Sequence, residues 1–235
     1  ITRPNAIKLL SDMEDLGLTA TTRRIRTYLT KMFDFAFDTG IITTMPLYKL
    51  PVIRANTKER FLTDAEIYYF WHGVNKIRSA RTRAALRLML LLGRRGIEVV
   101  SATWDQFDLD KKIWLMTPAK IHLKYRAKFK PVIMPLPPLA LKILEERRAS
   151  QSMWNFVFPS EYDPMTHQTV HSLNSTVRKR WKDMGFKEQW TPHDLRRTLS
   201  TQLAALDYEQ AQINRILAHK LQGVEGTYNR HEYVE

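Results

Sequence analysis

The spacing of apolar and polar residues predicts a chain that is mainly helical. Residues 5–16 and 20–39 each have apolar side chains at helical intervals, and the second segment has a broad apolar face. Thr19 or Thr21 is expected to cap the second helix, and Gly40 is expected to end it. The residues that follow, up to position 50, lose this period and predict an irregular return along the two helices.

A break in the pattern divides the chain. Residues 51–62 have little apolar periodicity and predict a linker between a small domain, residues 1–50, and a larger one, residues 63–235. Thr63 and Glu66 have the spacing of a capping box, so a helix is expected to begin there. Further helices are expected over about 80–92, 97–101, 137–146, 167–183, 193–206 and 209–218, with a short one around Tyr228.

Three short segments have the composition of strands. They are residues 104–107, 113–117 and 132–136, which are rich in aromatic and β-branched side chains. Because they follow one another closely, they predict a small antiparallel sheet. The fold class predicted for the chain is therefore mainly α with a small antiparallel β-sheet, in two domains.

The amino-acid composition indicates which kind of partner the protein binds. The 235 residues carry a formal net charge of +13, and a basic surface spread over a folded chain favours a polyanion such as DNA or RNA. The absence of cysteine excludes disulfides, thiol catalysis and zinc-thiolate sites. No apolar run reaches the roughly 18 residues that span a bilayer, and no signal peptide is visible. We therefore expect an intracellular protein without a membrane partner.

The candidate chemistry lies in a widely spaced set of basic residues that ends in a tyrosine. Arg95 opens the set, His193 and Arg196 follow three apart, His219 comes next, and Tyr228 closes it. Arginines can bind the non-bridging oxygens of a phosphodiester and offset the charge that grows in the transition state. A tyrosine oxygen can be the nucleophile. Since the cations are side chains, neither a metal nor another cofactor is expected.

Each pair alone has an ordinary structural explanation. Glu98 lies three residues after Arg95, which fits a surface ion pair as well as a carboxylate that holds a catalytic guanidinium. Asp194 is a candidate helix cap beside His193. Lys120, Lys124 and Lys128 lie between the second and third strands. They could contact phosphates from a solvated turn, or one of them could protonate a leaving 5′ oxygen.

Taken in order, these segments resemble the tyrosine recombinases, also called phage-type integrases. Residues 91–99 resemble the first arginine box of that family, residues 102–108 the strand after it, and residues 191–198 the second box. Residues 228–230 resemble the tyrosine segment of the branch found in integrative elements and satellite-type prophages. The resemblance implies a helical core-binding domain over residues 1–50, expected to be incomplete at its N-terminus, and a catalytic domain over residues 63–235.

The resemblance also implies a role for each candidate residue. Arg95, Arg196 and His219 would bind the scissile phosphate, and Tyr228 would attack it to leave a 3′-phosphotyrosyl bond. His193 would act in proton transfer or orient the site, and Glu98 would support it. Lys124 would be the general acid, with Lys128 as the alternative. DNA contacts are expected from Arg23, Arg24, Arg26, Lys31 and Lys128.

Two positions depart from the family pattern. Arg94 stands directly before Arg95, so the register of the first arginine depends on Glu98. Residue 218 is alanine where the family often has glycine. Neither departure removes a side chain that the chemistry needs.

The implied function is that of a site-specific DNA recombinase that integrates or excises a mobile element. Its expected partners are double-stranded DNA at attachment sites, three further copies in a homo-tetramer, and an accessory DNA-bending protein or excisionase. Its expected place is the bacterial cytoplasm, at the nucleoid during reaction. Three alternatives remain: type IB topoisomerase-like relaxation, a DNA-binding regulator with an unused site, and a metal nuclease built on His193 and Asp194.

Overall fold

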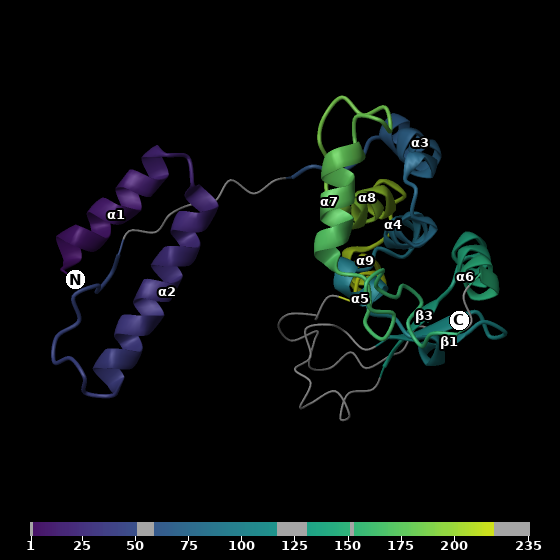
Figure 1. Ribbon diagram of the computed structural model, residues 1–235. Coiled ribbons are helices and arrows are strands. Elements are labelled where there is room, and N and C mark those ends of the chain that lie inside the picture. The colour runs from purple at the N-terminus through teal and green to yellow at the C-terminus, as the bar shows by residue number, and fades with distance from the viewer. Residues whose placement is uncertain (1, 51–58, 117–130, 151–152, 219–235) are drawn as a thin grey trace. The chain divides into compact units, whose positions relative to one another are not determined.

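The chain forms two compact units, Ile1–Glu59 and Arg60–Glu235. The computed structural model describes residues 2–50, 59–116, 131–150 and 153–218 (Figure 1). The predicted fold class is confirmed, since the described elements are mostly helices together with one small antiparallel sheet. No helix within these ranges is long and apolar enough to cross a membrane.

The first unit consists of two helices and an irregular return. Helices α1 (Arg3–Asp15) and α2 (Thr19–Asp38) confirm the two predicted helices. The return segment packs on them through Leu47 and Leu50, which are buried with Ala6 and Leu10 of α1. Arg26 of α2 donates a hydrogen bond of 2.7 Å to the carbonyl oxygen of Leu50. This bond fixes the return segment against α2.

The expected cap of α2 is wrong. Gly17 adopts a φ of +72°, which turns the chain so that Leu18 occupies the N-cap position. Thr19 and Thr21 are then already helical, and no side chain caps the helix end. The hydroxyl of Thr22 instead donates back to the carbonyl of Leu18, one turn earlier.

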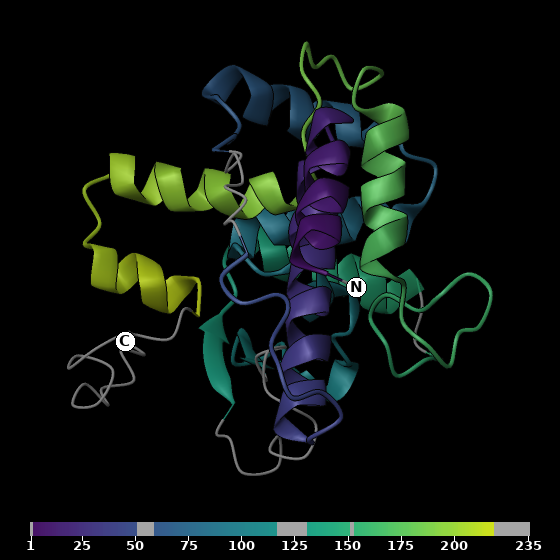
Figure 2. The same ribbon diagram turned by 90° about the vertical axis from the view of Figure 1, so that its left-hand side faces the viewer.

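The second unit is a helical domain with a sheet at one edge (Figures 1 and 2). Its first helix, α3, has the predicted capping box: Thr63 Oγ1 accepts from the backbone N–H of Glu66, and Glu66 Oε2 accepts from that of Thr63. Helix α4 packs against both α6 and α8, and α9 folds back beside α8. The helices are α3 (Asp64–Gly73), η1 (Val74–Lys76), α4 (Ala80–Leu92), α5 (Gly96–Val100), α6 (Pro138–Ser150), α7 (Val170–Arg180), α8 (Pro192–Ala205) and α9 (Gln210–Ile216).

The sheet has three antiparallel strands in the order β1-β2-β3. They are β1 (Phe107–Asp108), β2 (Ile113–Met116) and β3 (Val132–Pro135), with Trp114 opposite Met134. The prediction of a strand over residues 104–107 is wrong for its first three positions, which form the 3₁₀ helix η2 (Trp104–Gln106). The cause is a contact with a distant part of the chain, because the backbone N–H of Trp104 donates to the carbonyl of Asn155 rather than to a neighbouring strand.

The predicted helix over residues 167–183 is shorter in the structure. The backbone N–H of Gln168 donates to the carbonyl of Phe158 at 2.7 Å, and His167 forms a bridge with Pro159. These contacts hold residues 167 and 168 in extended pairing, so α7 begins only after Thr169. The side chain of Thr169 then caps the helix by accepting from the N–H of Ser172.

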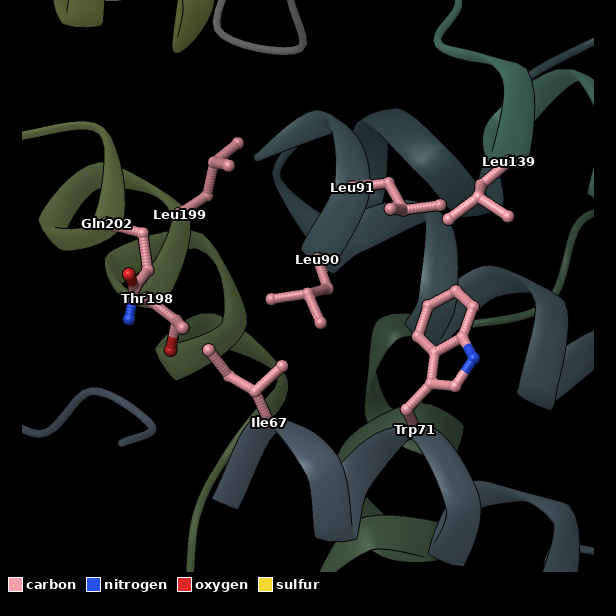
Figure 3. A pocket seen from close by; sticks show the side chains of 8 residues that line it. All are labelled: Ile67, Trp71, Leu90, Leu91, Leu139, Thr198, Leu199 and Gln202. Atoms are coloured by element: carbon pink, nitrogen blue, oxygen red, sulfur yellow. The ribbon is translucent and has the colours of Figure 1, made fainter. Parts of the chain in front are cut away.

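Helices α3, α4, α6 and α8 surround an apolar cavity of about 290 Å³ (Figure 3). Leu90 points into it from α4, and Ile67 and Trp71 face it from α3. None of the described residues that line it is Lys, Arg, His, Asp or Glu, so this lining does not suit a phosphate group. The cavity is lined by Ile67, Trp71, Leu90, Leu91, Leu139, Thr198, Leu199 and Gln202.

Candidate active site

The site begins where α4 ends. Gly93 takes a left-handed conformation (φ +59°), and a Cβ at this position would lie 2.7 Å from side-chain atoms of both Leu199 and Leu217. Both the backbone angle and the close packing therefore favour glycine here. The sharp turn that results leads directly into Arg94, Arg95 and α5.

Arg95 and Glu98 form the pair that their spacing predicted. Arg95 is the N-cap residue of α5, and the side chain of Glu98 is fully buried. One carboxylate oxygen of Glu98 accepts from the backbone N–H of Arg95 at 3.0 Å, and the other accepts from its Nη1 at 3.0 Å. The Arg95 side chain keeps 21% of its surface exposed. Glu98 thus fixes the guanidinium while leaving part of it accessible to a ligand.

A capping box fixes the start of α8. Pro192 is the first helical residue, as expected for proline. Asp194 Oδ2 accepts from the backbone N–H of Thr191 at 2.8 Å and from its hydroxyl at 2.9 Å. Asp194 Oδ1 accepts from Nη1 of Arg197 at 2.6 Å. Asp194 thus takes part in capping α8 as the capping-box partner of the N-cap residue Thr191, and both of its carboxylate oxygens are occupied.

Arg196 joins the ends of two other helices to α8. Its side chain is almost fully buried, at 4% exposure for the residue. Nη1 donates to the carbonyl of Gly93 at 2.5 Å, and Nη2 donates to the carbonyl of Leu217, just after α9, at 2.7 Å. Burial, and then the nearby charge of Arg95, lower the pKa of Arg196 to about 10, against an opposite effect of Glu98. At neutral pH the group therefore keeps its positive charge.

His193 lies at the surface on the first turn of α8. Desolvation by the surrounding protein lowers its pKa below the ordinary 6.5, and the charges of Arg197, Arg196 and Arg95 lower it further, while Asp194 raises it. The imidazole is therefore neutral at neutral pH. A neutral ring can accept a proton, which an imidazolium cannot.

The described structure brings part of the predicted set together. Arg95 and Arg196 lie close enough to His193 for their charges to lower its pKa. The charge of Arg95 also lowers the pKa of Arg196, and the charge of Glu98 raises it. Lys124, Lys128, His219 and Tyr228 lie outside the described residues. Within the described ranges, no three His, Asp or Glu side chains gather as metal ligands.

The candidate DNA contacts of the first unit lie on α2. Arg23, Arg24 and Lys31 are exposed, whereas Arg26 is half-buried and donates to the Leu50 carbonyl. Three side chains are thus accessible to a ligand, and Arg26 already has a structural partner.

Sequence reasoning missed two features of the site. Arg94 is fully buried, although it stands beside the partly exposed Arg95. Ala218 adopts a φ of +47°, a left-handed conformation that a non-glycine residue enters at a cost. The sequence held a signal for the left-handed conformation of residue 218, because glycine is frequent at this position in the family that the sequence resembles. For the burial of Arg94 it held no signal beyond the two adjacent arginines.

Fold and site together define a class of protein: a mainly helical domain that gathers two arginines and a histidine from helix ends, with a small antiparallel sheet at its edge. Residues 60–235 match the sequence profile of the Phage integrase family. The chain belongs to this family.

Individual relatives agree with this assignment. Prophage integrase IntZ of Escherichia coli strain K12 is 26% identical over 219 residues, which cover 91% of this chain and 52% of the relative. Prophage integrase IntA of the same strain is 25% identical over 234 residues, covering 97% of this chain and 54% of the relative. The chain thus spans about half the length of these curated relatives.

Solved structures show the same fold. A lambda integrase in a tetramer bound to a Holliday junction superposes with a TM-score of 0.74 at 17% identity. The match covers 96% of this chain and 67% of the lambda integrase chain. At this identity the likeness establishes the fold.

Proposed function

We propose that this chain is the DNA-cleaving part of a site-specific recombinase, an integrase that breaks and rejoins double-stranded DNA through a 3′-phosphotyrosyl bond. The observation that carries this proposal is the proximity of Arg95, Arg196 and His193, with Arg95 held by the buried Glu98 carboxylate. Two guanidinium groups beside a neutral imidazole provide charge stabilisation and a proton acceptor, which phosphoryl transfer to a tyrosine needs. Membership of the phage integrase family supports the same chemistry.

In the proposed reaction, Arg95, Arg196 and His219 bind the non-bridging oxygens of the scissile phosphate. The phenol of Tyr228 gives its proton to His193 as its oxygen forms a bond to phosphorus. The bond from phosphorus to the 5′ oxygen breaks, and Lys124 protonates the leaving oxygen. The phosphotyrosyl diester conserves the energy of the broken bond, so a 5′ hydroxyl of another strand can reverse the step without ATP.

The proposed partners follow from this chemistry. Double-stranded DNA at attachment sites is the substrate, and the net charge of +13 supports binding through phosphates. We assign the first unit as a core-binding domain in which Arg23, Arg24 and Lys31 contact the DNA backbone. Because the lambda integrase relative is a tetramer on a junction, we propose a homo-tetramer on DNA, assisted by a DNA-bending protein or an excisionase. The reaction would then take place at the bacterial nucleoid.

Covalent trapping tests the proposal. The protein is incubated in EDTA with duplex DNA that includes the ends of the element carrying the gene, and the products are separated on a denaturing gel. A slowly migrating protein–DNA adduct is expected for the parent and is expected to be absent for Tyr228→Phe, which lacks the nucleophilic oxygen. Binding without any adduct would favour a DNA-binding regulator, and relaxed circles without strand exchange would favour a topoisomerase.

The pH dependence of adduct formation is expected to reflect the lowered pKa of His193. The single-turnover rate should stay level on acidification until the pH falls below 6.5, the ordinary histidine pKa, because the folded protein keeps the ring neutral to lower pH. The same shift means that the unfolded chain binds more protons near that pH, so stability also decreases as the pH falls. Rates measured across this range for the parent and for His193→Gln, which cannot titrate, provide the comparison. An acid limb above pH 6.5, or one that His193→Gln retains, would contradict the assignment.

A further inference from the structure

Arg94 is a buried cation that has no carboxylate partner in the described part of the chain. Its exposed fraction is 0%, and among the described residues it forms no ion pair. Nε donates to the carbonyl of Leu92 at 3.1 Å, and Nη1 lies 3.7 Å from the sulfur of Met116. Nη2 has no hydrogen-bond acceptor within the described part of the chain. Within the described residues, a guanidinium with one oxygen acceptor and one weak sulfur acceptor is poorly compensated for its loss of water.

The end of α4 makes this burial tolerable. The last carbonyls of a helix lack intrahelical partners and carry partial negative charge, which favours a nearby cation. Arg94 donates to Leu92 O, and Arg196 donates to Gly93 O, the next carbonyl along the chain. Two guanidinium groups, one fully buried and one almost so, thus share the carbonyl end of α4.

Arg94 also belongs electrostatically to the candidate active site. Burial lowers its pKa to about 9, and the charges of Glu98, Arg196 and Arg95 act on it as well, the first raising and the other two lowering the pKa. At neutral pH the group remains protonated. Among the described residues, the guanidinium groups of Arg94, Arg95 and Arg196 all interact electrostatically with the Glu98 carboxylate, so positive charge exceeds negative charge within this group of four.

We propose that Arg94 is a positioning residue of the phosphate site, whose buried charge at the carbonyl end of α4 favours the doubly charged transition state of strand cleavage. This inference depends on the proposed function. Arg94 does not touch the DNA, because its side chain has no accessible surface. It acts by adding positive electrostatic potential to the site that Arg95 and Arg196 form.

The charge count gives the reason. A phosphodiester carries one negative charge in the ground state. When the tyrosine oxygen adds and its proton leaves, the oxygens around phosphorus carry two. A fixed positive charge nearby therefore stabilises the transition state more than the bound substrate. Binding depends on many phosphates along the duplex and should change little.

Three substitutions separate charge from packing and from hydrogen bonding. Arg94→Lys keeps a positive charge but not the planar fork. Arg94→Gln keeps a donor for Leu92 O but not the charge. Arg94→Met fills the space with an apolar side chain, and such replacements of buried charges are often neutral or stabilising. A melting temperature close to that of the parent confirms for each variant that the fold is intact.

The first measurement is the single-turnover rate of adduct formation at saturating protein, together with the Kd for the same duplex. For Arg94→Gln and Arg94→Met, the rate is expected to fall about tenfold or more while Kd changes less than about threefold. Arg94→Lys is expected to recover much of the rate. If Arg94→Gln cleaves like the parent, or if rate falls only in variants that also lose stability, Arg94 is merely structural and the proposal is overturned.

A second measurement needs no cleavage, so it separates this inference from the proposed function. Inorganic phosphate, mostly a dianion at pH 8, is titrated against each variant by calorimetry at low ionic strength. Arg196→Ala identifies the binding that belongs to the site. Arg94→Gln is expected to weaken that binding severalfold, whereas Arg94→Lys should bind like the parent. Equal phosphate affinity in Arg94→Gln and the parent would overturn the proposal, even if Tyr228 proves not to form an adduct.

Discussion

Replacing Arg196 by alanine is expected to lower the rate of DNA strand cleavage by about 10²- to 10³-fold, the usual loss when one fixed donor to a developing oxyanion is removed. The side chain holds the carbonyls of Gly93 and Leu217 through Nη1 and Nη2. A guanidinium has five N–H donors, so hydrogen atoms remain for a phosphate. Single-turnover adduct formation at saturating DNA measures the loss.

Two further variants show which part of Arg196 matters. Arg196→Lys keeps the charge but cannot bond both carbonyls in the same planar geometry, so it is expected to recover only a small part of the rate. Arg197→Ala removes the adjacent arginine, which pairs with Asp194 and is more exposed. Its rate should fall much less. Similar losses for Arg196→Ala and Arg197→Ala would show that general basic charge, rather than the held guanidinium, supports cleavage.

Local signals in the sequence predicted the helices and several of their ends. Thr63 with Glu66, and Asp194 at the start of α8, are capping residues whose partners lie three positions away, so the spacing alone reveals them. The 3₁₀ helix at residues 104–106 was not predictable in this way. Its backbone partner, Asn155, lies far along the chain, and composition alone favours a strand there.

Within the described part of the candidate site, local spacing predicted one side-chain pair, whereas the longer-range contacts of the arginines were not predictable. The spacing of Arg95 and Glu98 predicted their ion pair. The position of Glu98 distinguishes Arg95 as the paired arginine, but no local signal shows that Arg94 is buried, because its burial depends on the direction that the chain takes after Gly93. That direction depends on the left-handed turn and on packing against Leu199 and Leu217. The partners of Arg196 are likewise distant backbone carbonyls, which no sequence pattern encodes.

Replacing Trp190 by alanine is expected to lower the free energy of unfolding of the second unit by about 3–5 kcal/mol. The ring is fully buried. Its centroid lies 5.5 Å from that of Phe70 in an edge-to-face arrangement and 5.4 Å from that of Phe186. Alanine would leave a large cavity between these rings and lose the aromatic contacts. Urea denaturation followed by far-UV circular dichroism measures the change.

Trp190→Phe is the matched control, because it keeps an aromatic ring and removes an indole N–H that has no acceptor within the described part of the chain. This variant should lower the free energy of unfolding by about 1–2 kcal/mol, since the lost ring volume is partly offset by the loss of an unsatisfied donor.

Trp190 directly precedes Thr191, the residue whose backbone and hydroxyl bond to Asp194 at the start of α8. Alanine should therefore also loosen the turn that presents His193 and Arg196, and reduce adduct formation in the protein that is still folded. A stable alanine variant that cleaves at the parent rate would show that α8 is positioned without this ring.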